Sequence, residues 1–225
     1  MMFPGIRSLT IDLDGTLLDS LPDLAAAANA MLAELGEPER EVEEIRSFVG
    51  KGIVELVRRA LTEGRDCSLD QQHAITVFRR HYTLANGRAA RPFPGVMEGL
   101  DKLKALGLPM AVVTNKAMEF TEPLLQITGL ASYFSLTLGG DSLAEKKPHP
   151  MPLLHAAQHM DSTPASNLHV GDSRHDAEAA RAAGCPVALV PYGYSAGADV
   201  HKLDCDVIVA SLAELADLIA ADRTS

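Results

Sequence analysis

The sequence predicts an α/β protein, with a Rossmann-like parallel-sheet core covered by helices and a small all-helical cap inserted after the first strand. Short apolar runs typical of buried strands alternate with helical segments after residue 87. Before that point, residues 22–87 show helical spacing and little strand signal. The 225 residues are enough for one large domain or two smaller ones. We therefore expect a core of residues 1–21 and 88–225 and a cap of residues 22–87.

The first strand is predicted at residues 9–13, where an apolar run leads into a glycine turn. Ser20 is predicted to be the N-cap of the first cap helix, because Pro22 lies in the first turn and Asp23 follows three residues on. Alanine-rich residues continue this helix until Gly36 ends it. Further cap helices are expected at residues 41–48, 53–61 and 69–84, with turns at 86–87 and 92–95 marking the exit.

Helices and strands then alternate along the rest of the chain. Strands are expected at residues 109–115, 134–138, 167–171, 186–191 and 206–210. Helices are expected at residues 100–106, 119–127, 150–160, 176–183 and 212–221. Short connections between alternating elements indicate a parallel sheet with helices on both faces. In such sheets, ligands bind outside the carboxyl ends of the strands.

Two carboxylates, Asp12 and Asp14, stand at the end of the first predicted strand. On a strand they would point to the same side, because side chains alternate between faces with a period of two. Neighbouring carboxylates repel each other unless a cation or a proton compensates their charge. The pair therefore predicts a metal-assisted reaction centre, with a solvated turn as the simpler alternative.

More polar groups are predicted at the same edge of the sheet. They are Thr114, Asn115 and Lys116 after one strand, Lys147 after the next, and Asp172 and Asp176 after a third. Each has a simple structural explanation, since Thr114, Asn115 and Asp176 could cap helices and Lys147 could be a solvated charge. Their common position at one edge favours a functional site.

Composition and charge narrow the function classes. A formal net charge of −10 argues against a nucleic-acid partner, and it requires a local cation wherever an anionic substrate binds. The first ten residues show neither a signal peptide nor a membrane span. Three cysteines lie far apart without a CxxC or metal-ligand spacing, which predicts buried thiols in a reducing cytosol; they are Cys67, Cys185 and Cys205. We expect a cytoplasmic enzyme without a membrane partner.

Four motifs resemble the signatures of the haloacid dehalogenase superfamily of phosphohydrolases. In order they are DLDGT at residues 12–16, a strand-end Thr114, Lys147 before a proline, and GDSRHD at 171–176. The helical insert resembles the small cap of that family. Further segments resemble its subgroup that hydrolyses 2-phosphoglycolate; they are TNK at 114–116, GGD at 139–141, KKPHP at 146–150 and AAGCP at 182–186.

The resemblance implies roles for these residues. Asp12 would be the nucleophile that forms an aspartyl-phosphate, and an ordinary aspartate, with a pKa of about 3.9, is already ionised at neutral pH. Asp14 would be the general acid and then the general base. Thr114 and Lys147 would hold the phosphoryl oxygens, and Asn115 is expected in the same phosphate-binding pocket.

A metal is also implied by the resemblance. Mg²⁺ is expected, because it is a hard cation that prefers oxygen ligands. Its ligands would be the side chains of Asp12 and Asp172 and the backbone carbonyl of Asp14. Asp176 is expected to position Lys147 or the metal shell.

The predicted cap contains a candidate for substrate selection. Gly50-Lys51-Gly52 would place one cation, Lys51, between two flexible residues, Gly50 and Gly52, where it could meet a substrate carboxylate. The simpler interpretation is a helix connection with an exposed lysine.

The substrate that the resemblance implies is a small anionic phosphate monoester, with 2-phosphoglycolate hydrolysed to glycolate and phosphate. A phosphatase for sugar or amino-sugar phosphates and a phosphomutase stay open as alternatives. A dehalogenase would have no use for an acid at Asp14. A receiver-like acyl-phosphate signalling module would lack the helical insert and would carry its acceptor on a later strand. Both a monomer and a homodimer are compatible with the sequence.

Overall fold

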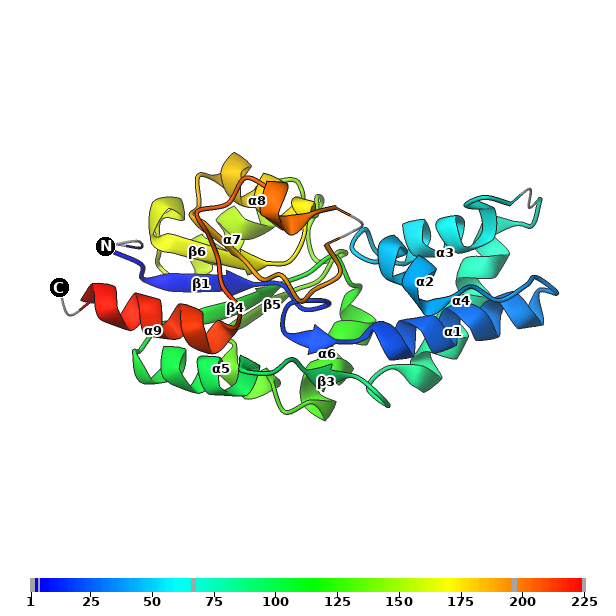
Figure 1. Cartoon of the computed structure of the whole chain (residues 1–225), viewed down its shortest axis with the longest axis horizontal. Coiled ribbons are helices and arrows are strands. Elements are labelled where there is room, and N and C mark those ends of the chain that lie inside the picture. Colours follow the sequence, from blue (N-terminus) through cyan, green and yellow to red (C-terminus); the bar gives the residue numbers. More distant parts are fainter. Residues whose placement is uncertain (1–2, 4, 66–67, 196–197, 224–225) are drawn as a thin grey trace.

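The core of the protein is a parallel sheet seen in the computed structural model, which describes residues 3, 5–65, 68–195 and 198–223 (Figure 1). Over this part of the chain the sheet has six strands in the order β5-β4-β1-β6-β7-β8, and every pairing is parallel. The strands are β1 (Ser8–Ile11), β4 (Met110–Val113), β5 (Leu136–Leu138), β6 (Asn167–Gly171), β7 (Val187–Leu189) and β8 (Val207–Ile208). This confirms the predicted parallel α/β core.

Helices cover both faces of this sheet, as Figure 1 shows. One face packs its apolar side chains against α5 (Val96–Ala105), α6 (Met118–Ile127) and α9 (Leu212–Arg223). The other packs against α7 (Met151–His159) and α8 (Arg174–Ala183). Leu9 and Ile11 of the central strand β1 face the first layer, as the period of two in a strand requires. Ser8 and Thr10 of β1 are also fully buried, although they are polar.

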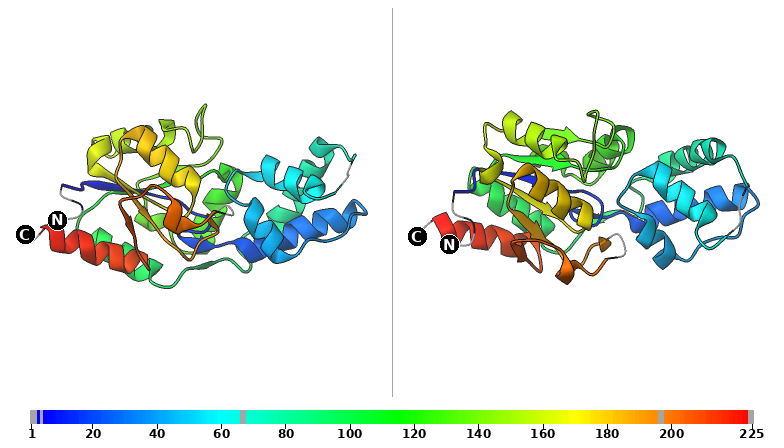
Figure 2. Two further views of the ribbon diagram at one scale, coloured as in Figure 1. Left: turned by 45° about the horizontal axis from the view of Figure 1, so that its top comes forward. Right: turned by 90° about the horizontal axis from the view of Figure 1, so that it is seen from above.

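A separate unit of helices lies beyond the carboxyl ends of the strands (Figures 1 and 2). Among the described residues it contains α1 (Leu21–Glu34), α2 (Val42–Phe48), α3 (Ile53–Thr62) and α4 (Gln71–Ala85). These helices share their own hydrophobic cluster, which includes Met31, Ile45, Val57 and Phe78. Their positions in the chain coincide with the segment for which a helical cap is predicted.

Two chain crossings join this helical unit to the sheet. They pair as short antiparallel strands, β2 (Leu18–Asp19) and β3 (Arg91–Pro92). The buried carboxylate of Asp23 accepts hydrogen bonds from three backbone N–H groups of the returning crossing, at 2.8 Å, 2.8 Å and 3.1 Å; their residues are Gly87, Ala89 and Ala90. Asp23 therefore fastens the outgoing chain to the returning one.

The predicted capping of α1 by the Ser20 hydroxyl is wrong in its detail. Ser20 occupies the N-cap position, but its hydroxyl donates to Asp14 Oδ1 at 2.5 Å and makes no capping bond. Asp23 is engaged with the other crossing, so it does not complete a capping box. Instead of capping α1, the side chains of Ser20 and Asp23 make hydrogen bonds at the junction between the sheet and the helical unit.

Other differences concern element ends. Asp176 is not the N-cap of α8; Ser173 is, and Asp176 completes its capping box from the third helical position. Helix α5 begins at Val96, four residues before its predicted start, because Gly95 supplies a left-handed turn directly before it. Strands β2 and β3 were not expected from the sequence, since two residues carry no periodic signal.

The cysteines are partly as expected. Cys185 is a buried free thiol, whereas Cys205 is only half-buried, and Cys67 lies outside the described residues. Within the described part of the chain, no helix has the length and apolar character that crossing a membrane requires.

Candidate active site

Asp12 and Asp14 lie in a tight turn directly after β1. The strand ends at Ile11, so the turn, and not the strand pleat, directs both carboxylates into one pocket. Gly15 adopts φ +87°, and a Cβ at this position would stand 2.5 Å from Asp172 Oδ2. Only glycine allows the turn to pass this close to the third carboxylate.

Lys147 forms an ion pair with the carboxylate of Asp12. Its Nζ lies 3.0 Å from Asp12 Oδ1 and 2.6 Å from Asp176 Oδ1, and the lysine is buried. Burial alone would lower the pKa of this ammonium, but the charges of Asp12 and Asp176 outweigh it and raise the pKa. Lys147 is therefore a fixed positive charge beside the predicted nucleophile.

Asp176 is saturated with hydrogen bonds. Its Oδ1 accepts from Lys147 and faces His169 Nε2 at 3.1 Å, and its Oδ2 accepts from the backbone N–H and hydroxyl of Ser173. Burial alone would raise the pKa of Asp176, but Lys147 and His169 hold it well below its usual range. The geometry supports the expectation that Asp176 positions Lys147.

A chain of buried polar side chains continues behind Asp176. His169 Nδ1 faces Thr10 Oγ1 at 3.0 Å, and Asn167 Nδ2 donates to the same hydroxyl at 3.1 Å. The Thr10 hydroxyl accepts from Asn167, so it can donate to Nδ1, which leaves the proton on His169 Nε2, facing Asp176. Burial lowers the pKa of His169, in keeping with a neutral ring. The last member of this hydrogen-bonded series is Ser8, whose hydroxyl donates to Asn167 Oδ1 at 2.8 Å.

Asp172 is held by the loop after β7. Its Oδ2 accepts from the backbone N–H groups of Tyr194 and Ser195 at 2.6 Å and 3.1 Å, and its Oδ1 from the Thr16 hydroxyl at 3.3 Å. Burial, with the charges of Asp176 and Asp12, raises the pKa of Asp172 to about 8.

The expectation of an ordinary pKa for Asp12 is wrong. Burial raises the pKa of this carboxyl to about 7, although Lys147 pulls it back down. An ionised Asp12 therefore needs more positive charge than Lys147 alone supplies.

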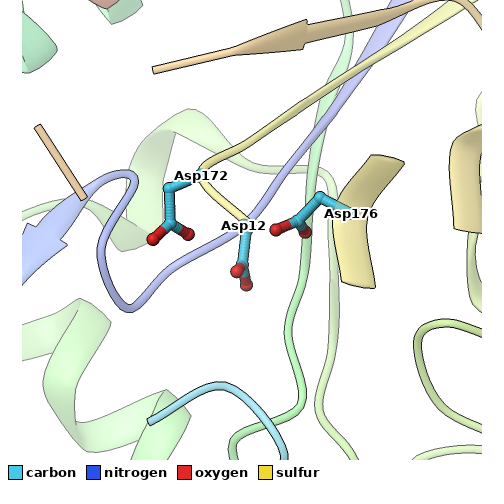
Figure 3. A group of neighbouring side chains, drawn as sticks. All are labelled: Asp12, Asp172 and Asp176. Carbon is cyan, nitrogen blue, oxygen red and sulfur yellow. The ribbon is translucent and has the colours of Figure 1, made fainter. Parts of the chain in front are cut away.

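Asp12, Asp172 and Asp176 converge in Figure 3, each offering an oxygen within 4.8 Å of the others. A set of carboxylate oxygens is the chemistry that a hard divalent cation prefers. Because Asp176 is already saturated, Asp12 and Asp172 have the oxygens that remain for an ion. The raised pKa values of these two groups are the second sign that the site fits a cation, which would offset their crowded charge.

Thr114 and Asn115 follow β4 and line the pocket with Asp12 and Asp14. Asn115 Nδ2 donates to the carbonyls of Gly50 and Lys147, both at 2.9 Å. The amide thus joins the loop before α3 to the loop that carries Lys147. A direct bond from this amide to a phosphate would require one of these two bonds to open.

Lys116 lines the same pocket. Its Nζ stands 3.1 Å from both oxygens of Asp14 and donates to the hydroxyl of Tyr82 from α4. Both Lys116 and Tyr82 are buried. The pair connects the general acid–base candidate to the helical unit.

The predicted substrate loop is only partly in the pocket. Gly50 and Gly52 line it, but Lys51 is exposed and lies in a neighbouring hollow with Lys146, Lys147 and His175. The Lys51 backbone carbonyl accepts a hydrogen bond from Lys146 Nζ at 2.9 Å.

Comparison with known proteins places this site in a family. Residues 10–190 match the family described as haloacid dehalogenase-like hydrolase. The chain belongs to this family. It is 52% identical over 223 residues to the phosphoglycolate phosphatase of Nitrosospira multiformis, covering 97% of this chain and 98% of the relative. It is 50% identical to that of Thiobacillus denitrificans over 217 residues, covering 95% and 96%.

A solved structure of the family agrees with the fold. The crystal structure of a predicted phosphoglycolate phosphatase from Haemophilus somnus superposes with a TM-score of 0.89 at 33% identity. The match covers 96% of this chain and 98% of the other. The family resemblance expected from the motifs is thus confirmed.

Three participants in the site were not singled out from the sequence. Tyr82 has the spacing of an apolar residue of a cap helix, and His169 occupies an inward position of a strand. Tyr194 donates to Asp19 and accepts from the backbone of Ser20 and Leu21 through its hydroxyl. Of these three residues, only Tyr194 could have been identified from the sequence, because it follows a predicted strand and so lies at the edge of the sheet where ligands bind.

Proposed function

We propose that this chain hydrolyses small phosphate monoesters, with 2-phosphoglycolate as the substrate and glycolate and phosphate as the products. One observation carries the proposal: Asp12 and Asp14 line one pocket, with Lys147 paired to Asp12 and Lys116 paired to Asp14. The relatives named phosphoglycolate phosphatase, at 50% and 52% identity over nearly the whole chain, support the choice of substrate.

In the first step an Asp12 oxygen attacks phosphorus while the bond from phosphorus to the ester oxygen breaks. Asp12 Oδ1 is held by Lys147 and by the Leu13 backbone N–H at 2.8 Å, which leaves Oδ2 for the attack. Asp14 gives its proton to the departing ester oxygen. Lys147 and the Thr114 hydroxyl stabilise the negative charge of the transferring group.

In the second step Asp14, now a carboxylate, accepts a proton from water. The water oxygen attacks phosphorus, the bond to Asp12 breaks, and phosphate leaves. Lys116 and the Ser20 hydroxyl hold Asp14 from two sides, so the same group can serve both steps without changing its position.

Mg²⁺ is the metal that we propose for the acidic cluster. The side chains of Asp12 and Asp172 and the backbone carbonyl of Asp14 would hold it. When bound, it supplies positive charge that keeps Asp12 ionised and offsets the charge of the phosphoryl group.

The helical unit formed by residues 22–87 acts as the cap in this proposal. The pocket beneath it has a cavity volume of about 40 Å³, with Leu24, Val49, Ile53 and Leu56 in its wall. This space suits a small leaving group, and the helical unit over it would limit the access of water to the phospho-enzyme.

We further propose a cytoplasmic location, supported by the free thiols of Cys185 and Cys205. A monomer or a homodimer would be active, because every group named in the two steps comes from one chain. Membership of the hydrolase family argues against the receiver-like alternative.

The test is a comparison of kcat/KM with Mg²⁺ for 2-phosphoglycolate and a panel of sugar, amino-sugar and nucleotide monophosphates. We expect a preference of about a hundredfold, or about 2.7 kcal/mol of differential transition-state binding. A flat profile or a better sugar phosphate would overturn the substrate, and no hydrolysis of any member would overturn the phosphatase itself.

A further inference from the structure

Lys116 is a buried cation whose partner is the proposed general acid. Its side chain is 3% exposed, and its Nζ is equally distant, 3.1 Å, from both oxygens of Asp14. It also donates to the Tyr82 hydroxyl and lies 4.7 Å from the centre of the Tyr82 ring. The two residues come from different units of the fold, Lys116 from the loop after β4 and Tyr82 from α4.

The surroundings of this ammonium favour an anion over a neutral group. Of the described residues that line the pocket, Lys116 is the one with a cationic side chain. Apolar side chains line other parts of the same pocket, among them Leu24, Ile53 and Leu56, and a charge interaction is stronger where water and its dielectric screening are excluded. The formal net charge of the protein is −10, so an anionic leaving group needs a local positive charge of this kind.

The ammonium can also accommodate another acceptor. It has three N–H donors, of which one meets Tyr82. The equal distances to both Asp14 oxygens let a single N–H be shared between them. The third N–H can then bond to a group that enters the pocket next to Asp14.

We propose that Lys116, held by Tyr82, binds a carboxylate on the leaving group and so selects substrates whose ester carbon carries one. This rests on the proposed function, because it requires the ester oxygen to take its proton from Asp14. An atom bonded to the ester carbon then lies beside the group that Lys116 already contacts. The ligand class is a small phosphate monoester with a carboxylate one carbon from the ester oxygen.

The sequence predicts that Lys51 meets the substrate carboxylate, but Lys51 does not line the pocket that contains Asp14. It is exposed and lines the neighbouring hollow, not the pocket that contains Asp12 and Asp14. Its role stays a prediction that the same experiment tests.

The experiment compares kcat/KM for 2-phosphoglycolate with kcat/KM for 2-hydroxyethyl phosphate, a neutral analogue of similar size. The ratio of the two is independent of the concentration of active enzyme, so a partly folded variant still gives a valid result. The variants are Lys116→Met, Lys116→Arg, Tyr82→Phe and Lys51→Met, with Lys202→Met as a control for loss of an exposed lysine outside the pocket.

We expect Lys116→Met to lower the ratio by about tenfold to a hundredfold, as loss of a charged hydrogen bond in a buried site does. Lys116→Arg keeps part of the preference, Tyr82→Phe lowers it by a few-fold, and Lys202→Met leaves it unchanged. Equal losses for both substrates in Lys116→Met would overturn the proposal, since Lys116 would then act on Asp14 alone. A fall in the ratio for Lys51→Met but not for Lys116→Met would also overturn it.

The two proposals fail in different ways. If the wild-type enzyme hydrolyses neither compound, the proposed substrate is wrong, and if it also hydrolyses no member of the phosphate-ester panel, the phosphatase function is wrong. If it hydrolyses both equally well, the phosphatase function stands and the carboxylate site is wrong.

Discussion

Substitution of Asp176 by asparagine tests whether this buried carboxylate positions Lys147. The change keeps the size of the side chain but replaces one of two acceptor oxygens by an N–H donor. In the native protein Asp176 Oδ1 accepts hydrogen bonds from Lys147 and His169, and Oδ2 accepts them from the backbone N–H and the hydroxyl of Ser173. Whichever way the amide turns, at least one buried donor faces another donor.

The magnitude follows from these contacts. Removing one partner of a buried ion pair costs about 3–5 kcal/mol, and the lower end applies here because Lys147 keeps Asp12 as a second partner. For a chain of this size each kcal/mol corresponds to about 2–4 °C in Tm, so a loss of about 3 kcal/mol in Asp176→Asn is expected to lower the Tm by about 6–12 °C.

The assay is thermal and urea unfolding followed by circular dichroism, together with kcat. The matched control is Glu178→Gln, which removes a carboxylate from the same helix. Glu178 pairs at 3.6 Å with Arg174, and both side chains are more than half exposed. Such surface pairs contribute little to stability. If Asp176→Asn and Glu178→Gln unfold at the same temperature, the buried network does not hold Lys147 as described.

Three further predictions concern the metal, the turn and the link between the two units. The pKa values of Asp12 and Asp172, about 7 and about 8, exceed that of an unfolded aspartate, so the folded chain binds more protons. In EDTA, the free energy of unfolding measured in urea should fall as the pH rises from about 4 to about 8, and added Mg²⁺ should restore more of it at pH 8 than at pH 5. A free energy of unfolding that rises over that pH interval in EDTA would contradict the prediction. In Gly15→Ala the new Cβ would stand 2.5 Å from Asp172 Oδ2 and would displace this proposed metal ligand. We expect the Mg²⁺ concentration needed for half-maximal turnover to rise by about tenfold or more, as it does when the support of a metal ligand is lost. An unchanged Mg²⁺ requirement would count against the close approach of Gly15 to Asp172. Tyr194→Phe, which removes a buried hydroxyl with three partners, should lower the free energy of unfolding by about 1–3 kcal/mol, and an effect below about 0.5 kcal/mol would show that those bonds are dispensable.

The sequence allowed the sheet and the strand-end groups to be predicted, because both depend on local pattern. An apolar run followed by Asp12 and Asp14 marks the end of β1 wherever the rest of the chain goes. Thr114, Lys147 and Asp172 were found in the same way, since parallel strands bring their carboxyl ends to one edge.

What the sequence did not predict depends on contacts between distant segments. The Ser20 hydroxyl had a local use as a helix cap, but Asp14 lies within reach and takes it. Tyr82 meets Lys116 only because the fold brings a residue of α4 next to the loop after β4. The raised pKa of Asp12 likewise comes from burial under the whole site, which no spacing of residues reveals.

The proposed mechanism requires Asp12 to carry the phosphoryl group during turnover. The most direct measurement is to mix enzyme, Mg²⁺ and 2-phosphoglycolate, quench in acid within the first turnover, and map phosphorylated peptides by mass spectrometry. We expect one phosphoryl group on Asp12 of the wild-type enzyme, and neither this label nor measurable turnover in a folded Asp12→Asn variant. A label on another residue, or turnover by Asp12→Asn close to that of the wild type, would contradict it.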